Sequence, residues 1–342
     1  KSFSTDKDGY FEINDLSSGT YVLFFYKLGY EVVQTPVVVE SDSKEISVEM
    51  EKLSRELTEL SVTDQQEQVF SLRRLREVEG PSIFAGKKTE VINLEQMVVN
   101  TSGNNARQIY SQISGLNIFE SNDAGLQLNI GGRGLDPSRS SNFNIRQNGY
   151  DISADVLGYP ESSYTPTAEA LDEIQVIRGA ASLQYGTQFG GLVNFKLKKP
   201  IRNKAIEWTS RQSVGSNALF TSFNSLSGTT GKLGYYGFFN YKNGDGFRPN
   251  SGFESQNAYI YTDYQLGDNT KLSADFTYLY YLAQQPGGLT DAQFYRNPEI
   301  SNRTRNWFEV DWKLAPAKLE HSFSSRTTYS LLAFGLNASR KS

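Results

Sequence analysis

Hydrophobic and polar residues alternate with a period of two along most of residues 200–342. In the clearest segment, 271–282, one face consists of Leu272, Ala274, Phe276, Tyr278, Tyr280 and Leu282, and the other carries Lys271, Ser273, Asp275 and Thr277. Such a segment is longer than the usual soluble strand of about 5–6 residues, and it has the length of a tilted strand that crosses a bilayer. The pattern therefore predicts transmembrane β-strands.

Seven strands of this kind are predicted, at roughly residues 204–214, 218–227, 232–242, 255–266, 270–282, 303–314 and 318–334. The connections at 228–231, 267–269 and 315–317 are short, whereas those at 243–254 and 283–302 are long and rich in Gly, Pro and Asn. A transmembrane barrel with short periplasmic turns and long outer loops alternates in this way. We therefore expect the long connections to face outwards, although the connection at 215–217 is short where the alternation expects a long one.

The segment 307–314 also has two faces, with Phe308, Val310, Trp312 and Leu314 on one and Trp307, Glu309, Asp311 and Lys313 on the other. A barrel turns its apolar positions to lipid and its polar positions inwards. We therefore expect Trp312 to face the bilayer, and Glu309, Asp311 and Asp275 to line the interior.

The rest of the chain divides into three regions. Residues 1–52 predict short strands at 20–26, 32–40 and 45–50, separated by Gly-containing turns. Residues 53–90 are rich in Glu, Arg, Gln and Ser and predict a linker with one helical turn near 70–77. Residues 91–199 mix a helical segment at 105–113 with strands near 115–118, 126–130, 142–147, 173–177 and 190–197, which indicates a compact α/β domain.

Composition removes several classes of function. The 342 residues contain 34 Lys and Arg against 38 Asp and Glu, a net charge of −4, so a general nucleic-acid binder is not indicated. With no Cys and one His, the sequence offers no disulfide, thiolate metal site or multi-histidine centre, and we predict neither a metal nor a cofactor. No apolar run approaches the roughly 20 residues of a membrane-spanning helix. A mean hydropathy of −0.49 is compatible with a transmembrane barrel.

Four Gly-containing motifs stand out between residues 130 and 195. They are Ile130-Gly131-Gly132-Arg133-Gly134, Arg146-Gln147-Asn148-Gly149, the run from Ala170 to Gly186 with its Val-Ile-Arg-Gly and Tyr-Gly, and Gly190-Gly191-Leu192-Val193-Asn194-Phe195. Together they resemble the plug domain of TonB-dependent outer-membrane receptors. The family usually has Asp-Gly where Asn148-Gly149 stands, and both pairs support the same turn.

Three further stretches resemble the ferric dicitrate receptor branch, namely 133–139 (Arg-Gly-Leu-Asp-Pro-Ser-Arg), 158–161 (Gly-Tyr-Pro-Glu) and 285–290 (Gln-Pro-Gly-Gly-Leu-Thr). Residues 1–52 resemble part of a carboxypeptidase-regulatory-like β-sandwich, an extension found in receptors of the Bacteroidetes group. The resemblance implies a mainly β chain of four parts: the partial sandwich (1–52), a linker (53–90), an α/β plug (91–199), and the N-terminal strands of the transmembrane antiparallel β-barrel around it (200–342).

The resemblance implies active import and no enzymatic activity. In this family the ligand binds at the outward-facing plug apex, and the TonB–ExbB–ExbD complex then pulls the TonB box by strand addition and rearranges the plug. The candidate TonB box is Leu57-Thr58-Glu59-Leu60-Ser61-Val62-Thr63, although its chemistry alone indicates a linker packed on the next domain. The expected location is the outer membrane of a Gram-negative bacterium, among lipid and lipopolysaccharide, with the plug and N-terminal domain facing the periplasm.

The number of strands conflicts with a complete receptor. Plugged transporters of this kind have 22 strands, and an open sheet edge in lipid is not viable. We therefore expect these residues to be part of a longer polypeptide.

The resemblance implies a ferric chelate, ferric citrate or a siderophore, as the ligand. A polyanionic chelate calls for Arg donors that bind carboxylates bidentately, together with polar and aromatic contacts. The candidate ligand-binding residues are Arg139, Ser140, Ser141, Arg146, Tyr159, Tyr164 and Arg248. Loop packing remains the alternative for the two tyrosines, and simple solvation for Arg248.

A second set of residues is expected to shape the plug itself: Arg133, Gly134, Arg178, Gly179, Tyr185, Gly186, Gly190 and Gly191. Of these, the two arginines are expected to hold the plug against carboxylates of the barrel wall.

Two other functions stay open. The barrel could import a non-iron nutrient, such as a glycan, a peptide or another metal chelate, with a surface lipoprotein as partner. A soluble all-β enzyme acting on glycans through paired carboxylates is the remote alternative, for which the sequence offers no catalytic motif.

Overall fold

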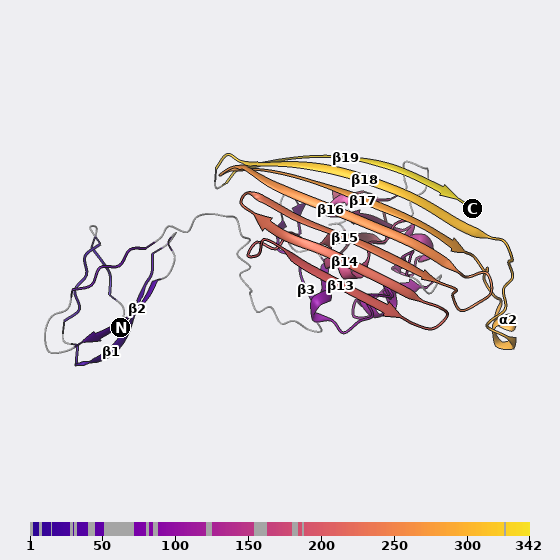
Figure 1. The fold of residues 1–342 in the computed structure, drawn as a ribbon, viewed down its shortest axis with the longest axis horizontal. Helices are drawn as coiled ribbons and strands as arrows, with labels where there is room; N and C mark the ends of the chain where they lie inside the picture. The colour runs from indigo at the N-terminus through magenta and orange to yellow at the C-terminus, as the bar shows by residue number, and fades with distance from the viewer. Residues whose placement is uncertain are drawn as a thin grey trace. The chain divides into compact units, whose positions relative to one another are not determined.

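The computed structural model describes residues 3–6, 9–14, 16–27, 30, 33–39, 45–50, 72–79, 82–84, 88–120, 125–153, 163–179, 184–186, 188–324 and 326–342. The chain forms two compact units, Lys1–Gln65 and Gln66–Ser342 (Figure 1). In the part of the chain that is described, no helix has the length and apolar character needed to cross a membrane.

The described residues of the first unit contain one antiparallel pair of strands. Strand β1 (Gly19–Phe25) pairs with β2 (Val33–Val39) along its whole length. Both strands lie close to their predicted positions. The third strand expected in this unit is not found, because residues 45–50 have no regular structure.

A six-stranded sheet forms the centre of the plug region, the name used here for the described residues of 72–199. Its strands are β3 (Leu72–Arg73), β6 (Lys88–Asn93), β9 (Phe143–Gln147), β10 (Tyr150–Asp151), β11 (Leu171–Arg178) and β12 (Gly191–Leu197), in the order β10-β9-β12-β11-β6-β3. Strand β12 is parallel to β9, and the other neighbours are antiparallel. Beside the sheet lie helix α1 (Ala106–Tyr110), the hairpin of β7 (Leu116–Phe119) and β8 (Asn129–Gly132), and the pair β4 (Val78–Glu79) and β5 (Ser82–Ile83).

Two details of the plug region differ from the sequence-based expectation. Residues 72–77 begin with strand β3 and contain no helical turn, because Leu72 and Arg73 pair with Ile92 and Val91 at the edge of the sheet. Strand β6 was not predicted at all, since it is short and lies beside a polar segment. Both strands owe their conformation to pairing with residues distant in sequence.

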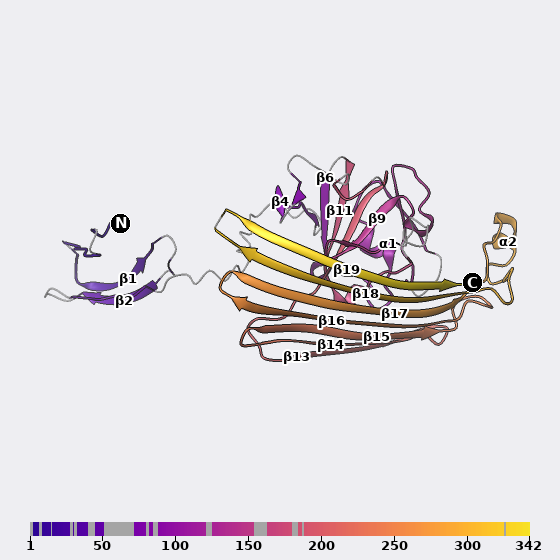
Figure 2. The same cartoon turned by 90° about the horizontal axis from the view of Figure 1, so that it is seen from above.

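The second sheet contains seven strands and is named the wall sheet. They are β13 (Glu207–Val214), β14 (Phe220–Thr230), β15 (Leu233–Gly244), β16 (Phe253–Gly267), β17 (Thr270–Gln284), β18 (Trp307–Ser322) and β19 (Thr328–Lys341), each antiparallel to the next. The plug region packs on one side of this sheet, its inner face (Figure 2). The predicted mainly β architecture, with an α/β domain packed against long antiparallel strands, is therefore found.

The connections between the wall strands place the long loops together. Residues 215–219, 245–252 and 285–306 connect strands at one end, named the long-loop end, while 231–232, 268–269 and 323–327 connect them at the short-turn end. The long loop 285–306 includes helix α2 (Asp291–Arg296), which begins with a capping box formed by Thr290 and Gln293.

Strand β17 has the two faces that its alternation predicts. Thr277 and Tyr281 are fully buried beneath the plug region, while Leu272 and Phe276 point outwards with 42% and 43% of their surface exposed. Because the buried and exposed positions alternate strictly, the period of two in the sequence correctly marks the inner and outer faces here.

The faces of β18 are the reverse of the prediction. Trp312 is 1% exposed and stacks on Tyr164 of the plug region, with ring centroids 6.4 Å apart. Glu309 and Asp311 lie on the outer face, where they pair with Lys341 and Lys313. The physical reason is that the plug region presents an apolar surface to β18. The apolar face of β18 therefore turns inwards and is buried against the plug region.

The turn predicted at 315–317 is also wrong. Strand β18 continues through Pro316 to Ser322, and the turn to β19 lies at 323–327. The pairing of β18 with β17 skips Ala315 and Pro316, because proline has no N–H to donate. The pairing of β18 with β19 continues, and Pro316 lies opposite Phe334. A single proline thus interrupts one ladder without ending the strand.

Candidate functional site

The plug region is fastened to the wall sheet at the turn between β9 and β10. Asn148 and Gly149 have φ angles of 49° and 91°, the left-handed geometry of an Asn-Gly hairpin turn. The Asn148 side-chain amide donates to the Tyr259 hydroxyl of β16 at 3.2 Å, and its Oδ1 accepts from the Leu197 backbone at 3.1 Å. One turn residue therefore joins the plug sheet to the wall.

The residues on either side of this turn extend the attachment. Gln147 Nε2 donates to Thr277 Oγ1 at 2.9 Å, and the Tyr150 hydroxyl donates to Asp275 Oδ1 at 2.8 Å. Gln147 and Tyr150 are buried, and they also bond to each other at 2.8 Å. Burial, followed by the charge of Asp275, raises the pKa of Tyr150 well above its ordinary value, so the hydroxyl keeps its proton for donation. We name residues 147–150 the docking turn.

Two further contacts reach the neighbouring part of the wall. Tyr164, a predicted ligand-binding residue, is fully buried against Trp312. Gln127 Nε2 donates to the Tyr281 hydroxyl at 2.8 Å. The structure thus gives Tyr164 a packing environment, which was the alternative weighed for it.

Arg146, also predicted to bind ligand, makes its contacts within the plug region. Its Nε donates to Asn144 Oδ1 at 2.8 Å, its Nη1 donates to the Gly149 carbonyl at 2.6 Å, and its guanidinium lies 4.9 Å from the centre of the Tyr185 ring. Burial lowers the pKa of Arg146, an effect that Asp151, 3.8 Å away, opposes. These contacts favour a structural role and place Tyr185, predicted to be structural, in the same cluster.

The other three plug-side candidates lie together between β8 and β9. Arg139 is exposed, with a φ of 55°, and its backbone N–H donates to Asn129 Oδ1 at 2.8 Å. Ser140 is fully buried and donates to the Leu128 carbonyl at 2.7 Å, while Ser141 is half-buried. Ser140 therefore supports the turn, and Arg139 is presented at its surface, within electrostatic range of Tyr281 on the inner wall.

Arg248 holds two long loops together. Its Nε donates to the Ile300 carbonyl and its Nη2 to the Gly287 carbonyl, both at 2.8 Å. Asn250 adds bonds to the carbonyls of Gln285 and Asn306, both at 3.0 Å. The loops 245–252 and 285–306 are thereby joined at the long-loop end.

Arg178 is paired inside the plug region instead of with a wall carboxylate. Its guanidinium forms an ion pair with Glu90 of β6 and donates to the Ser114 carbonyl at 2.8 Å. Arg133 lies at an exposed turn with a φ of 59°. Arg178 therefore ties β11 to its neighbour β6 and to the turn before β7.

Two adjacent glycines allow a close approach between strands of the plug sheet. A Cβ at Gly190 would lie 2.6 Å from the Asn142 carbonyl oxygen, and one at Gly191, whose φ is 128°, would lie 2.6 Å from the Ile177 carbonyl oxygen. Any larger residue would force the backbone apart. The remaining predicted plug glycines with left-handed φ are Gly134, Gly179 and Gly186.

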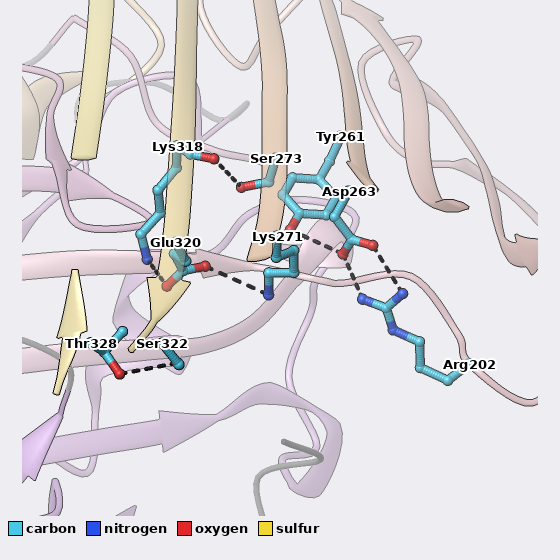
Figure 3. A network of polar contacts seen from close by, with 9 residues as sticks. All are labelled: Arg202, Tyr261, Asp263, Lys271, Ser273, Lys318, Glu320, Ser322 and Thr328. Carbon is cyan, nitrogen blue, oxygen red and sulfur yellow. Dashed lines mark hydrogen bonds and ion pairs between the residues drawn. The ribbon is translucent and has the colours of Figure 1, made fainter. Parts of the chain in front are cut away.

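The connection from the plug region into β13 is fixed by a polar network on the wall (Figure 3). Arg202 binds both carboxylate oxygens of Asp263, the first at 2.9 Å, and Tyr261 donates to the same carboxylate at 3.2 Å. In the same view Glu320 accepts from Lys318 at 2.6 Å and lies 3.6 Å from Lys271. The bidentate Arg–Asp pair sets where the chain enters the wall.

Sequence reasoning missed Glu169, a carboxylate at the boundary with the first wall strands. It lies in the 3₁₀ turn η4 (Ala168–Ala170), is 5% exposed, and has Oε1 3.8 Å from Nη1 of Arg211. Burial raises the pKa of Glu169, against the attraction of Lys242 and then Arg211. The available signal was an acid between two alanines, directly before the strand that begins at Leu171.

Several expectations lie outside the described residues. These are Tyr159, the 158–161 loop, and the candidate TonB box Leu57–Thr63. Among the residues that are described, no group of three or more His, Asp or Glu side chains could hold a metal ion.

One family model matches the plug region. It is described as the TonB-dependent Receptor Plug Domain and covers residues 85–192, which is less than half of the chain. The plug and wall together are similar to the ferric citrate transporter FecA in its unliganded form, with a TM-score of 0.63 and 22% identity over 74% of this chain and 40% of that chain.

Two further solved structures have the same fold. The ferric-catecholate import receptor Fiu from E. coli K12, in its open form, matches with a TM-score of 0.57 and 17% identity over 74% of this chain and 39% of that chain. The ferripyoverdine receptor of the outer membrane of Pseudomonas aeruginosa matches with a TM-score of 0.55 and 17% identity over 69% of this chain and 32% of that chain. The chain thus spans 40% or less of the length of these three proteins, and at such identities the likeness concerns the fold.

Proposed function

We propose that the protein is a TonB-dependent active transporter of a Gram-negative outer membrane and that it imports a ferric chelate, either ferric citrate or a siderophore complex. The observation that carries the proposal is a plug domain docked on the inner face of strands of the β-barrel type. Its structural neighbours transport or bind ferric ligands. In this role the chain is not an enzyme.

The outer face of the wall sheet supports a place in a bilayer. On β16 the outward residues from Ala258 through Ile260, Thr262 and Tyr264 to Leu266 are mostly apolar. The eight steps from Ala258 to Leu266 span about 27 Å along the strand. At a tilt of about 40° from the membrane normal this is roughly 20 Å across the membrane, close to the apolar band of about 25 Å in outer-membrane barrels. Towards the long-loop end the outward residues become Gln256 and Glu254, which we place above the hydrocarbon.

In this orientation the long-loop end faces the outside and the short-turn end faces the periplasm. From the family resemblance we assign the N-terminal domain and the segment Leu57–Thr63 to the periplasmic side, where the TonB–ExbB–ExbD complex acts. Strand addition by TonB to this segment would apply force towards strand β3, which in the described residues pairs with the plug sheet through Leu72 and Arg73.

Arg139 is the residue we favour for ligand contact. Its side chain is exposed beside Ser141, and its charge acts on Tyr281 of the wall. A guanidinium in this position can bind a chelate carboxylate through two parallel hydrogen bonds. Tyr159, which lies outside the described residues, stays a further candidate on the sequence alone.

Ligand binding by the full-length protein, purified in detergent, tests the proposal. Calorimetric titration with ferric citrate and a small panel of ferric siderophores, with the iron-free chelators as controls, should show saturable binding of one ferric species. The absence of binding across the panel would move the assignment to a non-iron nutrient such as a glycan or peptide.

A further inference from the structure

The turn that carries Arg139 has a strained backbone. Arg139 and Ser140 follow one another with φ angles of 55° and 56°, and Arg133, a few residues earlier, has a φ of 59°. This left-handed region is unfavourable for a residue that has a Cβ, and Gly, Asn and Asp occupy it far more readily than arginine or serine. We name residues 137–141 the Arg139 turn. Two consecutive strained positions persist only where contacts with the rest of the fold hold them.

Ser140 provides one of these contacts from inside the plug region. It is fully buried, and its hydroxyl donates to the Leu128 carbonyl at 2.7 Å and accepts from the Ile130 backbone N–H at 3.2 Å. One hydroxyl thus pairs with an acceptor and a donor of the chain at β8, as a neighbouring strand would. Because leaving such groups buried and unpaired is costly, these bonds keep Ser140 in its left-handed conformation.

Asn129 holds the backbone of Arg139 itself. Its side chain is buried, and its Oδ1 accepts from the Arg139 backbone N–H at 2.8 Å. Gly131 lets the chain lie close on β8 here, since a Cβ at Gly131 would be 2.5 Å from the Leu135 carbonyl oxygen. The backbone of Arg139 is therefore fixed to β8, while its side chain is exposed.

The Arg139 turn lies towards the long-loop end of the wall. Gln127, two residues before Asn129, donates to the Tyr281 hydroxyl at 2.8 Å, and Tyr281 is close to the end of β17 at Gln284. The charge of Arg139 also acts on Tyr281. In the orientation proposed above, the turn is thus on the outward side of the plug region.

We propose that Asn129 and Ser140 are positioning residues, which hold the Arg139 turn in its strained conformation so that the Arg139 guanidinium is already oriented for an oxyanion of the chelate. This inference rests on the ligand contact proposed above for Arg139. A turn shaped by stability alone would carry Gly or Asn at position 139, because either fits a φ of 55° with less strain. The arginine stands there despite its backbone conformation, so its side chain is the reason for the strain.

A fixed backbone raises affinity through preorganisation. To bind a carboxylate bidentately, the guanidinium must present two N–H groups in one plane towards it. Immobilising a flexible side chain on binding weakens affinity by roughly two- to ten-fold, and a backbone that is already fixed reduces this loss. Releasing the Arg139 turn should therefore weaken ligand binding through Arg139.

A double-mutant cycle on ligand affinity tests the inference. The full-length, detergent-purified protein is titrated calorimetrically with the ferric species that the parent binds, as parent, Asn129→Ala, Arg139→Ala and the double variant. Asn129→Ala should weaken binding about three- to ten-fold in the parent, and less than about two-fold once position 139 is alanine. Asn129→Asp keeps an acceptor oxygen for the Arg139 N–H, so its affinity should stay within about two-fold of the parent.

Three results would overturn the inference. They are an equal loss from Asn129→Ala in both backgrounds, no loss from Asn129→Ala or from Arg139→Ala in the parent, and binding by Asn129→Asp as weak as that by Asn129→Ala. Failure of the transport proposal is distinct, because then the parent itself would bind none of the ferric species.

The strain is measured separately, by two replacements at the same position. Glycine adopts the left-handed conformation more readily than alanine, so Arg139→Gly should be more stable than Arg139→Ala, with an unfolding constant at least about two-fold smaller. Ser138, exposed in the same turn and without a positive φ, is the control, and there the glycine variant should be the less stable one. Both variants at position 139 should bind the ferric species equally weakly, because neither has the guanidinium. The same order of stability at both positions, or tighter binding by Arg139→Gly, would overturn the inference.

Discussion

The Tyr150 hydroxyl donates a hydrogen bond to the Asp275 carboxylate at 2.8 Å, across the boundary between the plug and the wall. Tyr150 is 2% exposed, and its ring also lies 6.0 Å from that of Phe334 on β19. An acceptor buried at this boundary is costly to leave without its donor. The pair is therefore a sensitive reporter of how firmly the plug is docked.

Removing only the hydroxyl of Tyr150 tests how much this hydrogen bond contributes to docking. Tyr150→Phe keeps the ring and removes the donor to Asp275, so we expect the free energy of unfolding to fall by about 1.5–3 kcal/mol. Denaturant titration of the detergent-solubilised protein, followed by tryptophan emission, measures the change. Tyr264→Phe, on the exposed outer face of β16, is the matched control and should stay within about 0.5 kcal/mol. Equal stability of the two variants would contradict a role in docking.

Asp172 should make stability depend on pH in the sense opposite to most carboxylates. Asp172 is exposed at the surface of the plug region; its partial desolvation raises its pKa above the ordinary value of 3.8, and the nearby charges of Glu173 and Glu95 act in the same direction. Its stabilising contribution is therefore complete below the unfolded pKa and is lost as the pH rises through the folded pKa. Asp172→Asn should consequently be slightly more stable than the parent at pH 7, with the gain shrinking as the pH falls towards 4.

Asp136 provides the control of opposite sign. A hydrogen bond from the Ser138 backbone, 3.0 Å long, lowers the pKa of this exposed carboxylate. Its contribution is present above the unfolded pKa and is lost as the pH falls through the folded pKa. Asp136→Asn should therefore give no gain at pH 7. The free energy of unfolding of both variants and of the parent is measured between pH 4 and 7. A gain in stability at pH 7 for both variants, or for neither, would contradict the predicted signs.

The sequence predicts most of the wall because strand length, spacing and alternation are local properties. Strands β13 to β17 appear near their expected positions, whereas the turn between β18 and β19 lies at 323–327 instead of 315–317. The turn dipeptide Asn148-Gly149 adopts the expected geometry. Which face of a strand turns inwards is not local when a plug fills the interior. Trp312 faces inwards because Tyr164, far away in the chain, offers it a ring to pack on.

The candidate site was less predictable for a related reason. An arginine next to glycine or serine in the sequence indicates an exposed anion-binding site. In the structure, however, Arg146 and Arg248 donate hydrogen bonds to backbone carbonyl groups that folding brings close to them. Glu169 gave the converse problem, since its environment comes from Arg211 and Lys242 on separate wall strands. The sequence identifies side chains that can donate hydrogen bonds to a ligand. Which of them instead bond to the protein is decided by contacts between residues that are distant in sequence.

Arg248→Ala distinguishes a loop clamp from a ligand contact. Loss of its hydrogen bonds to the Ile300 and Gly287 carbonyls should loosen loops 245–252 and 285–306. We expect amide hydrogen exchange in both loops to become at least ten-fold faster, without ligand present. Arg296→Ala, in the exposed helix α2 of the same loop, is the control and should leave exchange at 245–252 unchanged. Weaker ligand binding with unchanged loop exchange would restore the original assignment of Arg248 to the ligand.

A charge placed on the outer face of β16 locates the bilayer. Ile260 is 56% exposed and pairs with Phe276, which also points outwards, so both lie within the apolar band. Ile260→Lys should destabilise the folded, membrane-inserted protein by about 2–4 kcal/mol, as a lysine does near the middle of the hydrocarbon. Gln256→Lys, four residues along the same strand and on the same face, should cost no more than about 1 kcal/mol because that position lies above the band. Folding titrations in lipid vesicles measure both. Equal costs at the two positions would show that the outer face of this sheet does not contact the hydrocarbon as proposed.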